Sequence, residues 1–247
     1  MSQNNHWKFF DESDLSGCTL IIPSVAVGNV GQLACDLLIS SLQMKKIATV
    51  YSPALIPVLG YDPYDLNSSC LSSSCEVYHC KLRKIVVVQI RAPLVYKYAQ
   101  GFLKKFVEKF VEKKIKNVVL LTSSYAHEKK HISTSPFRYV STEPKLYADE
   151  INRLKLVEHE QDEGRLKIFG GGFASMFFEI SKEHLLPCFI LYKFCSEGDN
   201  IPDAYDMIYN LNKILSLFNQ NIDFLSQLIQ PVSWKLLFGR PPPINIY

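Results

Sequence analysis

Long apolar runs are missing from this sequence of 247 residues. No window approaches the roughly 18 uninterrupted apolar residues that a membrane-spanning helix requires. The first residues, from Met1 to Asp14, hold no apolar core behind a basic start, so they predict neither a signal peptide nor a membrane anchor. These absences predict a soluble, intracellular protein that does not bind membranes.

An excess of one charge is also missing. The chain has 27 basic and 24 acidic residues and a formal net charge of +3, which is too small to indicate a nucleic-acid partner. Lysines do cluster between positions 104 and 116, but Glu108 and Glu112 are interleaved with them. This cluster indicates the solvated face of a helix.

Catalytic signatures are absent as well: the chain has no G-x-S-x-G nucleophile motif, no paired-cysteine redox motif and no kinase or phosphate-loop signature. A helix N-terminus that follows a strand, as at Gly28-Asn29-Val30-Gly31, can bind an anion. The dinucleotide fingerprint needs three glycines, however, so we interpret these two as letting a strand turn into a helix. The sequence predicts no catalytic residue and no cofactor.

One group of possible metal ligands combines Cys70, Cys75, His79 and Cys80. Its spacing, C-x4-C-x3-H-C, lacks the paired C-x2-C knuckles of structural zinc sites. Most of the seven cysteines lie in apolar runs, where a thiol behaves as a small hydrophobe. We therefore expect reduced thiols and no metal here.

A second group matches the letters of the H-E-x-x-H zinc motif, with Glu128 directly after His127 and His131 four residues after it. A zinc protease places this motif in an amphipathic helix. Here it lies in a polar connection, rich in serine and lysine, that closes at Pro136. We expect no zinc chemistry from it.

The sequence does contain short apolar runs rich in valine and isoleucine, which are typical of strands covered by helices on both faces. They span residues 20–27, 47–51, 85–90, 118–122 and 188–194. Apolar residues at helical spacing follow at 33–38, 102–111 and 204–218. This alternation predicts an α/β fold, a single domain with a mostly parallel sheet flanked by helices.

The remaining segments complete the predicted organisation. Residues 1–16 form an N-terminal arm, 17–240 the α/β domain, and 241–247 a proline-stemmed tail. Within the domain we expect a loop at 66–74, a long polar connection after Tyr125, a helix over 143–160 and a short strand at 167–169. The glycines Gly170–Gly172 and the carboxylates Glu197, Asp199 and Asp203 have structural explanations, a tight turn and a helix start.

Five segments, in order along the chain, resemble the proteasome assembly chaperone family: residues 24–40, 133–140, 170–172, 196–204 and 233–243. The resemblance implies a non-enzymatic chaperone that pairs with proteasome assembly chaperone 1 as a heterodimer. It implies binding to α subunits of the 20S proteasome, promotion of α-ring assembly and hindrance of off-pathway ring dimers. A fold similar to nucleoside phosphorylases, and residence in cytoplasm and nucleus, are also implied.

The C-terminal tail is the protein-binding site that the resemblance implies. In this family, tails ending in a hydrophobic residue, a tyrosine and any residue dock between α subunits. The last residues here are Ile244, Asn245, Ile246 and Tyr247, so the Ile-Tyr pair lies one place late. Pro241–Pro243 would hold the tail extended. The alternative is a frayed end that binds nothing.

A second class of function is an enzyme of nucleoside phosphorylase type, with a pocket near Gly28, Ser123 and Gly171. Such an enzyme needs cations or convergent N–H groups for phosphate, and a carboxylate for the sugar or base. The sequence does not supply that set at the predicted strand ends. Nor does it indicate which surface meets a partner chaperone.

Overall fold

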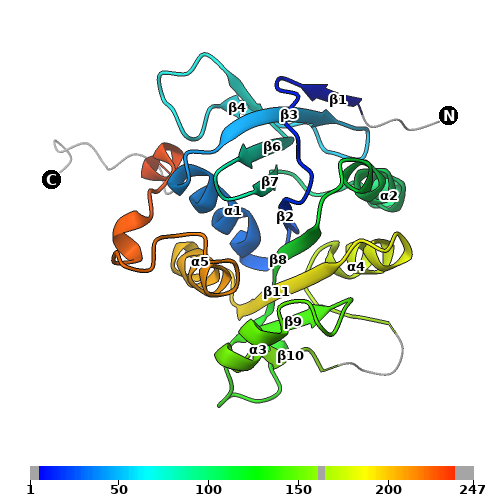
Figure 1. Cartoon of the computed structure of the whole chain (residues 1–247), viewed down its shortest axis with the longest axis vertical. Helices are drawn as coiled ribbons and strands as arrows, with labels where there is room; N and C mark the ends of the chain where they lie inside the picture. The colour runs from blue at the N-terminus through cyan, green and yellow to red at the C-terminus, as the bar shows by residue number, and fades with distance from the viewer. Residues whose placement is uncertain (1–5, 161–164, 237–247) are drawn as a thin grey trace, which may run out of the picture.

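The computed structural model describes residues 6–160 and 165–236, which form one domain around a nine-stranded sheet (Figure 1). In spatial order the strands are β1 (His6–Phe9), β3 (Lys45–Tyr51), β6 (Cys75–Cys80), β7 (Ile85–Ile90), β2 (Thr19–Pro23), β8 (Asn117–Tyr125), β11 (Cys188–Cys195), β9 (Phe137–Ser141) and β10 (Val157–Glu158). Each predicted apolar run coincides with a strand of this sheet, except that the run at 20–27 extends past β2, which ends at Pro23. The α/β prediction is therefore confirmed.

The sheet is mixed rather than mostly parallel. Of the eight neighbouring pairs among the described strands, four are parallel and four antiparallel. The four central strands β7, β2, β8 and β11 run parallel, and the strands on both sides introduce the antiparallel pairs. Our prediction was wrong for these flanking strands. An apolar run predicts that a strand is buried, but it does not predict whether the strand runs parallel or antiparallel to its neighbour. The likeness to nucleoside phosphorylases stays a prediction.

Helices cover both faces of the sheet (Figure 1). α1 (Val30–Ser41) and α5 (Ile201–Leu215) pack on one face, and α2 (Tyr96–Glu112) and α4 (Ala174–Glu183) on the other. Alternate residues of a strand point to opposite faces. Ile21 therefore packs in the core beneath α1 and α5, while Leu20 and Ile22 pack in the core beneath α2 and α4. Among the described residues, no helix has the length and apolarity needed to cross a membrane.

The predicted N-terminal arm contains an edge strand. β1 pairs antiparallel with β3, and the indole of Trp7 lies against Phe106 and Phe110 of α2, at 5.4 and 5.6 Å between ring centroids. This packing joins the start of the chain to the α2 face of the sheet. The boundaries 1–16, 17–240 and 241–247 stay predictions.

Several local predictions were wrong. The polar connection after Tyr125 contains a strand, β9, and the predicted helix over 143–160 shrinks to α3 (Ala148–Leu154), followed by β10. Tyr147 and Lys155 adopt left-handed backbone conformations on either side of α3. Residues 167–169 form no strand. These segments have few apolar residues at regular spacing, so their structure depends on neighbours distant in sequence.

The remaining elements are short. β4 (Leu59–Tyr61) and β5 (Leu71–Ser73) form a separate two-stranded sheet between β3 and β6, within a segment predicted as irregular. The described residues also contain four 3-10 turns: η1 (Val27–Asn29), η2 (Ala126–Glu128), η3 (Leu225–Gln227) and η4 (Val232–Leu236). We call residues 52–74, which include β4 and β5, the flap. It projects beyond the sheet at the top of Figure 1.

Candidate functional site

The carboxyl ends of the parallel strands are where α/β proteins bind small ligands, and here they are sealed. Ser24, just after β2, donates a hydrogen bond from its hydroxyl to the Gly171 carbonyl at 2.8 Å and accepts one from the Phe173 amide at 2.9 Å. The hydroxyl of Thr122 donates to the same Gly171 carbonyl at 3.0 Å. The triple-glycine turn is thus bonded to the ends of β2 and β8.

The neighbouring hydroxyls of β8 are used in the same way. Ser123 donates to the Val27 carbonyl, and Ser124 donates to the Phe169 carbonyl at 2.8 Å. All four hydroxyl side chains at this edge are buried. A hydroxyl that donates to a backbone carbonyl is not hydrogen-bonded to a base, so none is arranged as an activated nucleophile.

The glycines at this edge are required by close packing. Gly172 has a φ of +63°, and a β-carbon built on it would lie 2.1 Å from the Val25 carbonyl oxygen. A β-carbon on Gly28 would lie 2.7 Å from the side chain of Asn200, and one on Gly31 would lie 2.5 Å from the Leu121 carbonyl oxygen. Protein atoms therefore occupy the space that an anion would need.

The pocket of our second hypothesis, near Gly28, Ser123 and Gly171, is filled by these contacts. Its serine hydroxyl is bonded to Val27 and its glycine carbonyl is bonded to Ser24 and Thr122. The structure brings the three predicted residues together, but as a packed turn. No observation on the described residues favours nucleoside phosphorylase chemistry.

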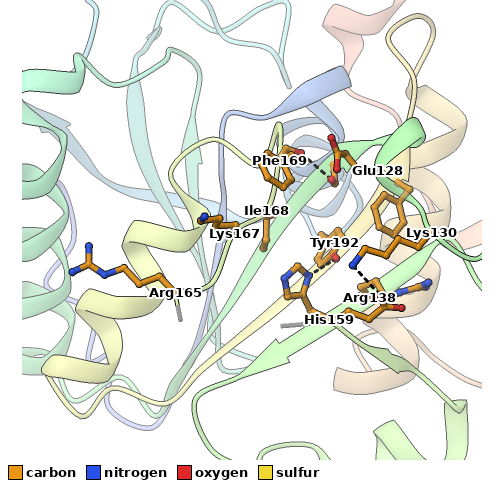
Figure 2. Close-up of a pocket in the computed structure, with 12 residues that line it drawn as sticks. Glu128, Lys130, Arg138, His159, Arg165, Lys167, Ile168, Phe169 and Tyr192 are labelled. Atoms are coloured by element: carbon orange, nitrogen blue, oxygen red, sulfur yellow. Dashed lines mark hydrogen bonds and ion pairs between the residues drawn. The ribbon is translucent and has the colours of Figure 1, made fainter. Parts of the chain in front are cut away.

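A small cavity of about 80 Å³ lies beside the glycine turn, at the carboxyl ends of β8 and β11, and is also lined by β9 and residues 165–169 (Figure 2). The imidazole of His159 and the hydroxyl of Tyr192 share a hydrogen bond of 2.7 Å within it. Burial raises the pKa of Tyr192 well above its ordinary value, so the phenol stays protonated at neutral pH. It cannot act as a base there.

Charges in this cavity are largely partnered. Lys130 lies 3.4 Å from a carboxylate oxygen of Glu160. Arg138, 3% exposed, donates to the carbonyls of Ser135 and Phe137. Figure 2 shows Arg165 pointing away from the other lining side chains. The arrangement is a mixed-charge recess in which the hydroxyl of Ser124 donates to a backbone carbonyl and that of Tyr192 is bonded to His159.

The cysteine and histidine candidates for zinc are not brought together. Cys70 is exposed on the flap, Cys75 is buried in β6, and His79 lies 3.8 Å from the sulfur of Cys18. His127 contacts Glu128 at 3.6 Å and His131 belongs to a separate ion pair. Within residues 6–160 and 165–236, no group of three or more His, Cys, Asp or Glu side chains could hold a metal ion.

The carboxylates near the start of α5 have structural partners. Asp203 binds the ammonium of Lys193 at 2.7 Å and accepts a hydrogen bond from the Asn200 amide at 2.8 Å. Asp199 accepts the first free backbone N–H of the helix, from Ile201, at 3.1 Å. The prediction of a helix start rather than a catalytic set is consistent with these contacts.

The flap is held down by a buried ionic network that the sequence did not predict. Arg91, just after β7, binds Asp36 of α1 through two nitrogens, at 3.1 and 2.9 Å, and donates to the Tyr64 hydroxyl at 3.1 Å. Tyr64 in turn donates to Asp36. Burial, and then the charge of Asp36, raise the pKa of Tyr64 well above its ordinary value. Its phenol therefore stays a neutral donor.

A second branch of the network starts at Glu76 on β6, which is fully buried. Its carboxylate accepts hydrogen bonds from Ser72 at 2.8 Å, Tyr78 at 2.9 Å and Lys46 at 3.0 Å. Ser72 also accepts from Arg91 at 3.1 Å, which joins the branches. Such bidentate and charge-assisted bonds are the strong ones in proteins. They fix the inner side of the flap to the sheet.

A signal for this network was present in the sequence. Asp36 interrupts the apolar stripe of α1 and Glu76 precedes an apolar run. A buried carboxylate requires a partner, because burial of an unpaired charge is very costly. The sequence did not show that the partner was Arg91.

The outer side of the flap is apolar. Leu59, Tyr61 and Leu66 are 70%, 86% and 69% exposed. The chain returns to the flap near its end, where the Ser233 amide donates to the Pro63 carbonyl at 3.2 Å. The predicted binding residues Ile244, Asn245, Ile246 and Tyr247 lie outside the described residues.

Comparison with known proteins decides the family. The model of the PAC2 family matches residues 20–224. The chain belongs to the PAC2 family. The sealed strand ends and the buried part of the flap both fall within the matched residues.

Relatives and solved structures extend this assignment. Proteins named proteasome assembly chaperone 2 from Xenopus tropicalis and Homo sapiens are each 35% identical to the chain, over 249 and 255 residues. These alignments cover 94% and 95% of this chain and 95% and 96% of those proteins. The Danio rerio protein of the same name is 37% identical over 244 residues, 92% of this chain and 94% of its own.

Two archaeal crystal structures share the fold of this PAC2 family chain. Pyrococcus furiosus PbaB, described as a proteasome activator, aligns with a TM-score of 0.70 at 18% identity and covers 92% of this chain and 93% of its own. PbaA, described as a homologue of proteasome-assembly chaperone, aligns with 0.71 at 15% and covers 91% of each. At these identities the likeness concerns the fold alone.

Proposed function

We propose that this PAC2 family chain is a non-enzymatic chaperone of proteasome assembly. It acts as a heterodimer with proteasome assembly chaperone 1, binds α subunits of the 20S proteasome, promotes α-ring assembly and hinders off-pathway ring dimers. The observation that carries the proposal is the 35% identity, over about 95% of the chain, to proteins named proteasome assembly chaperone 2. It would work in the cytoplasm and nucleus.

The sealed strand ends support a role without catalysis. The hydroxyls of Ser24, Thr122, Ser123 and Ser124 hold the chain's own carbonyls. A chaperone of this kind needs surface rather than a pocket. It must bind subunits tightly enough to order them and then leave, which suits patches of moderate area.

The test of this function is reconstitution. The full chain, co-expressed with proteasome assembly chaperone 1 from the same species, is expected to elute as a heterodimer and to bind free α subunits. α-ring formation should be faster with the heterodimer than without it. A chain that binds neither component, and cleaves nucleosides when phosphate is supplied, contradicts the proposal.

The tail gives the first prediction. Deletion of Ile244–Tyr247 should weaken binding of the heterodimer to assembled α rings by about tenfold or more, which is about 1.4 kcal/mol, because Ile246 and Tyr247 supply the docking contacts. The heterodimer should stay intact. Surface plasmon resonance with immobilised α rings measures the affinity, and size-exclusion chromatography measures whether the heterodimer is intact.

The matched control for the deletion is Asn245→Ser, which keeps both apolar side chains and the terminal carboxylate. It should bind within about twofold of the unmodified heterodimer. Equal affinity of the deletion variant and the control would remove the tail from the proposed mechanism.

A further inference from the structure

Exposed apolar side chains are concentrated on the flap. Among the described residues, nineteen large hydrophobic side chains are exposed, and six of them lie within the 23 residues of the flap. They are Ile56, Val58, Leu59, Tyr61, Leu66 and Leu71. Single exposed apolar residues are normal, but a contiguous group marks an interaction site.

The flap is also poor in charge. Asp62 and Asp65 are its only charged residues. Each accepts a backbone N–H two residues later, from Tyr64 and Asn67, at 2.9 Å. The centre of a protein interface is typically depleted of charge and enriched in aromatic residues. The outer side of the flap has this composition.

An apolar groove of about 540 Å³ runs beside these residues, between the flap and the end of β3. Leu55, Val58, Leu59 and Tyr51 line it. Ser74 holds the groove in shape: its hydroxyl donates to the Ile56 carbonyl at 2.7 Å and accepts from the Val58 amide at 2.8 Å. The surface is therefore formed before any partner binds, which lowers the cost of ordering it.

We propose that the flap is the surface that binds the partner chaperone, a homologous α/β chain that presents an apolar segment with basic side chains at its rim. This assignment rests on the proposed function. A stable interface takes about 20–30 residues from each side, and 18 of the 23 flap residues are not buried. Asp62 and Asp65 provide the negative charges that a basic rim would complement.

Two further features favour this partner over an α subunit. Permanent interfaces are more apolar than transient ones, and under the proposed function the heterodimer persists while α subunits bind and leave. In the described part of the chain, β4 pairs only with β5. Its other edge can therefore accept a strand from the partner, as in other complexes built on a sheet edge.

The test compares two leucine-to-glutamate substitutions at exposed positions, Leu59 at 70% and Leu82 at 87%. Leu59→Glu, alone and with Tyr61→Glu, places charge at the centre of the flap. The control Leu82→Glu changes a leucine that is 87% exposed in the turn between β6 and β7. The six residues of β6 lie between the flap and this turn. A strand of that length places the turn about 20 Å from the end of the flap.

The double flap variant should bind proteasome assembly chaperone 1 at least about thirtyfold more weakly than the unmodified chain, as expected for central interface residues. The Leu82→Glu control should stay within about twofold of it. Hydrogen exchange of residues 52–74 should slow when the partner is added. Unchanged urea midpoints for all variants would show that the folded state is intact.

Other occupants of the flap give different results, and each overturns the assignment. Undiminished binding of the double variant to the partner chaperone excludes the flap. Loss of α-subunit binding alone assigns the flap to an α subunit. A dimer of the isolated chain that the double variant abolishes assigns it to a second copy. Faster exchange in the flap after deletion of residues 237–247 assigns it to the chain's own tail.

Failure of the proposed function is distinguishable from failure of this assignment. If the unmodified chain does not bind proteasome assembly chaperone 1, the heterodimer itself is excluded. If the unmodified chain binds and the double variant binds equally well, the heterodimer stands and the flap is excluded.

Discussion

The sealed strand ends and the flap are two loop regions of one sheet that use the same kind of residue in opposite ways. At the strand ends, Ser24, Ser123 and Ser124 turn their hydroxyls inward to backbone carbonyls and close the space. On the flap, the hydroxyl of Ser72 donates to buried Glu76 and that of Ser74 donates to the Ile56 carbonyl. Both bonds lie on the inner side, so the outer surface of the flap stays apolar. Serine content alone therefore does not distinguish a closed site from an open one.

A substitution at the sealed strand ends should lower the free energy of unfolding more than one in the flap. Gly172→Ala adds a methyl group to a backbone with a φ of +63°, where the β-carbon would lie 2.1 Å from the Val25 carbonyl oxygen. We expect a loss of about 3 kcal/mol or more in the free energy of unfolding, from the strained backbone and the clash together. Urea denaturation followed by circular dichroism measures it.

The control for this substitution is Gly101→Ala in α2, where an added β-carbon has no atom within 4 Å. A helical glycine replaced by alanine should raise the free energy of unfolding by about 0.5–1 kcal/mol. If both alanine variants are equally stable, the glycine turn does not seal the sheet.

Loss of the ionic network that anchors the flap should have the next largest effect on the free energy of unfolding. Arg91→Ala leaves the carboxylate of Asp36, whose side chain is 11% exposed, without its cation. Removing one partner of a buried ion pair costs about 3–5 kcal/mol, and we expect the lower end because the Tyr64 hydroxyl still donates to Asp36. Denaturation gives the free energy, and hydrogen exchange should locate the largest change in residues 52–74.

Arg83→Ala is the matched control, because Arg83 is exposed in the turn between β6 and β7. Its free energy of unfolding should stay within about 0.5 kcal/mol of the original. A flap that exchanges no faster in Arg91→Ala than in Arg83→Ala would mean that the ionic network does not hold it.

The reaction rates of cysteine thiols distinguish the flap from the sealed strand ends without a substitution that changes stability. Cys70 is exposed on the flap, whereas Cys195 is buried at the strand ends, where loss of hydration and then the charge of Asp203 raise the pKa of its thiol. A raised pKa lowers the thiolate fraction at pH 8, and the thiolate is the reactive form. Cys70 should react rapidly with a disulfide reagent, and Cys195 only as the protein unfolds.

Absorbance of the released thiol reports these rates. In Cys70→Ser the fastest phase should disappear while the slow phases keep their amplitudes. A fast phase that survives this substitution would place an accessible thiol elsewhere and weaken the contrast between the two regions.

The centre of the fold was predictable because its strands are apolar on both faces. The runs at 85–90, 118–122 and 188–194 coincide with β7, β8 and β11. The antiparallel flanks were not predictable in this way. β9 follows a polar segment, and β10 is only two residues long and pairs with β9, so neither carries a periodic pattern of its own.

The candidate site was predicted only in part. The glycine turns were correctly interpreted as structural, but residues 66–74 of the flap were expected to be a loop since serine and asparagine dominate them. Its structure depends on Asp36, Tyr64, Glu76 and Arg91, which are separated by up to 55 positions. Local patterns do not encode which distant charges meet, so three-dimensional information was required.

The hydrogen bond between Ser233 and Pro63 fixes where the last part of the chain departs. The described chain therefore ends three residues after a direct contact with the flap. A protein that contacts the chain at Ser233 and a protein bound to the flap would therefore lie next to each other.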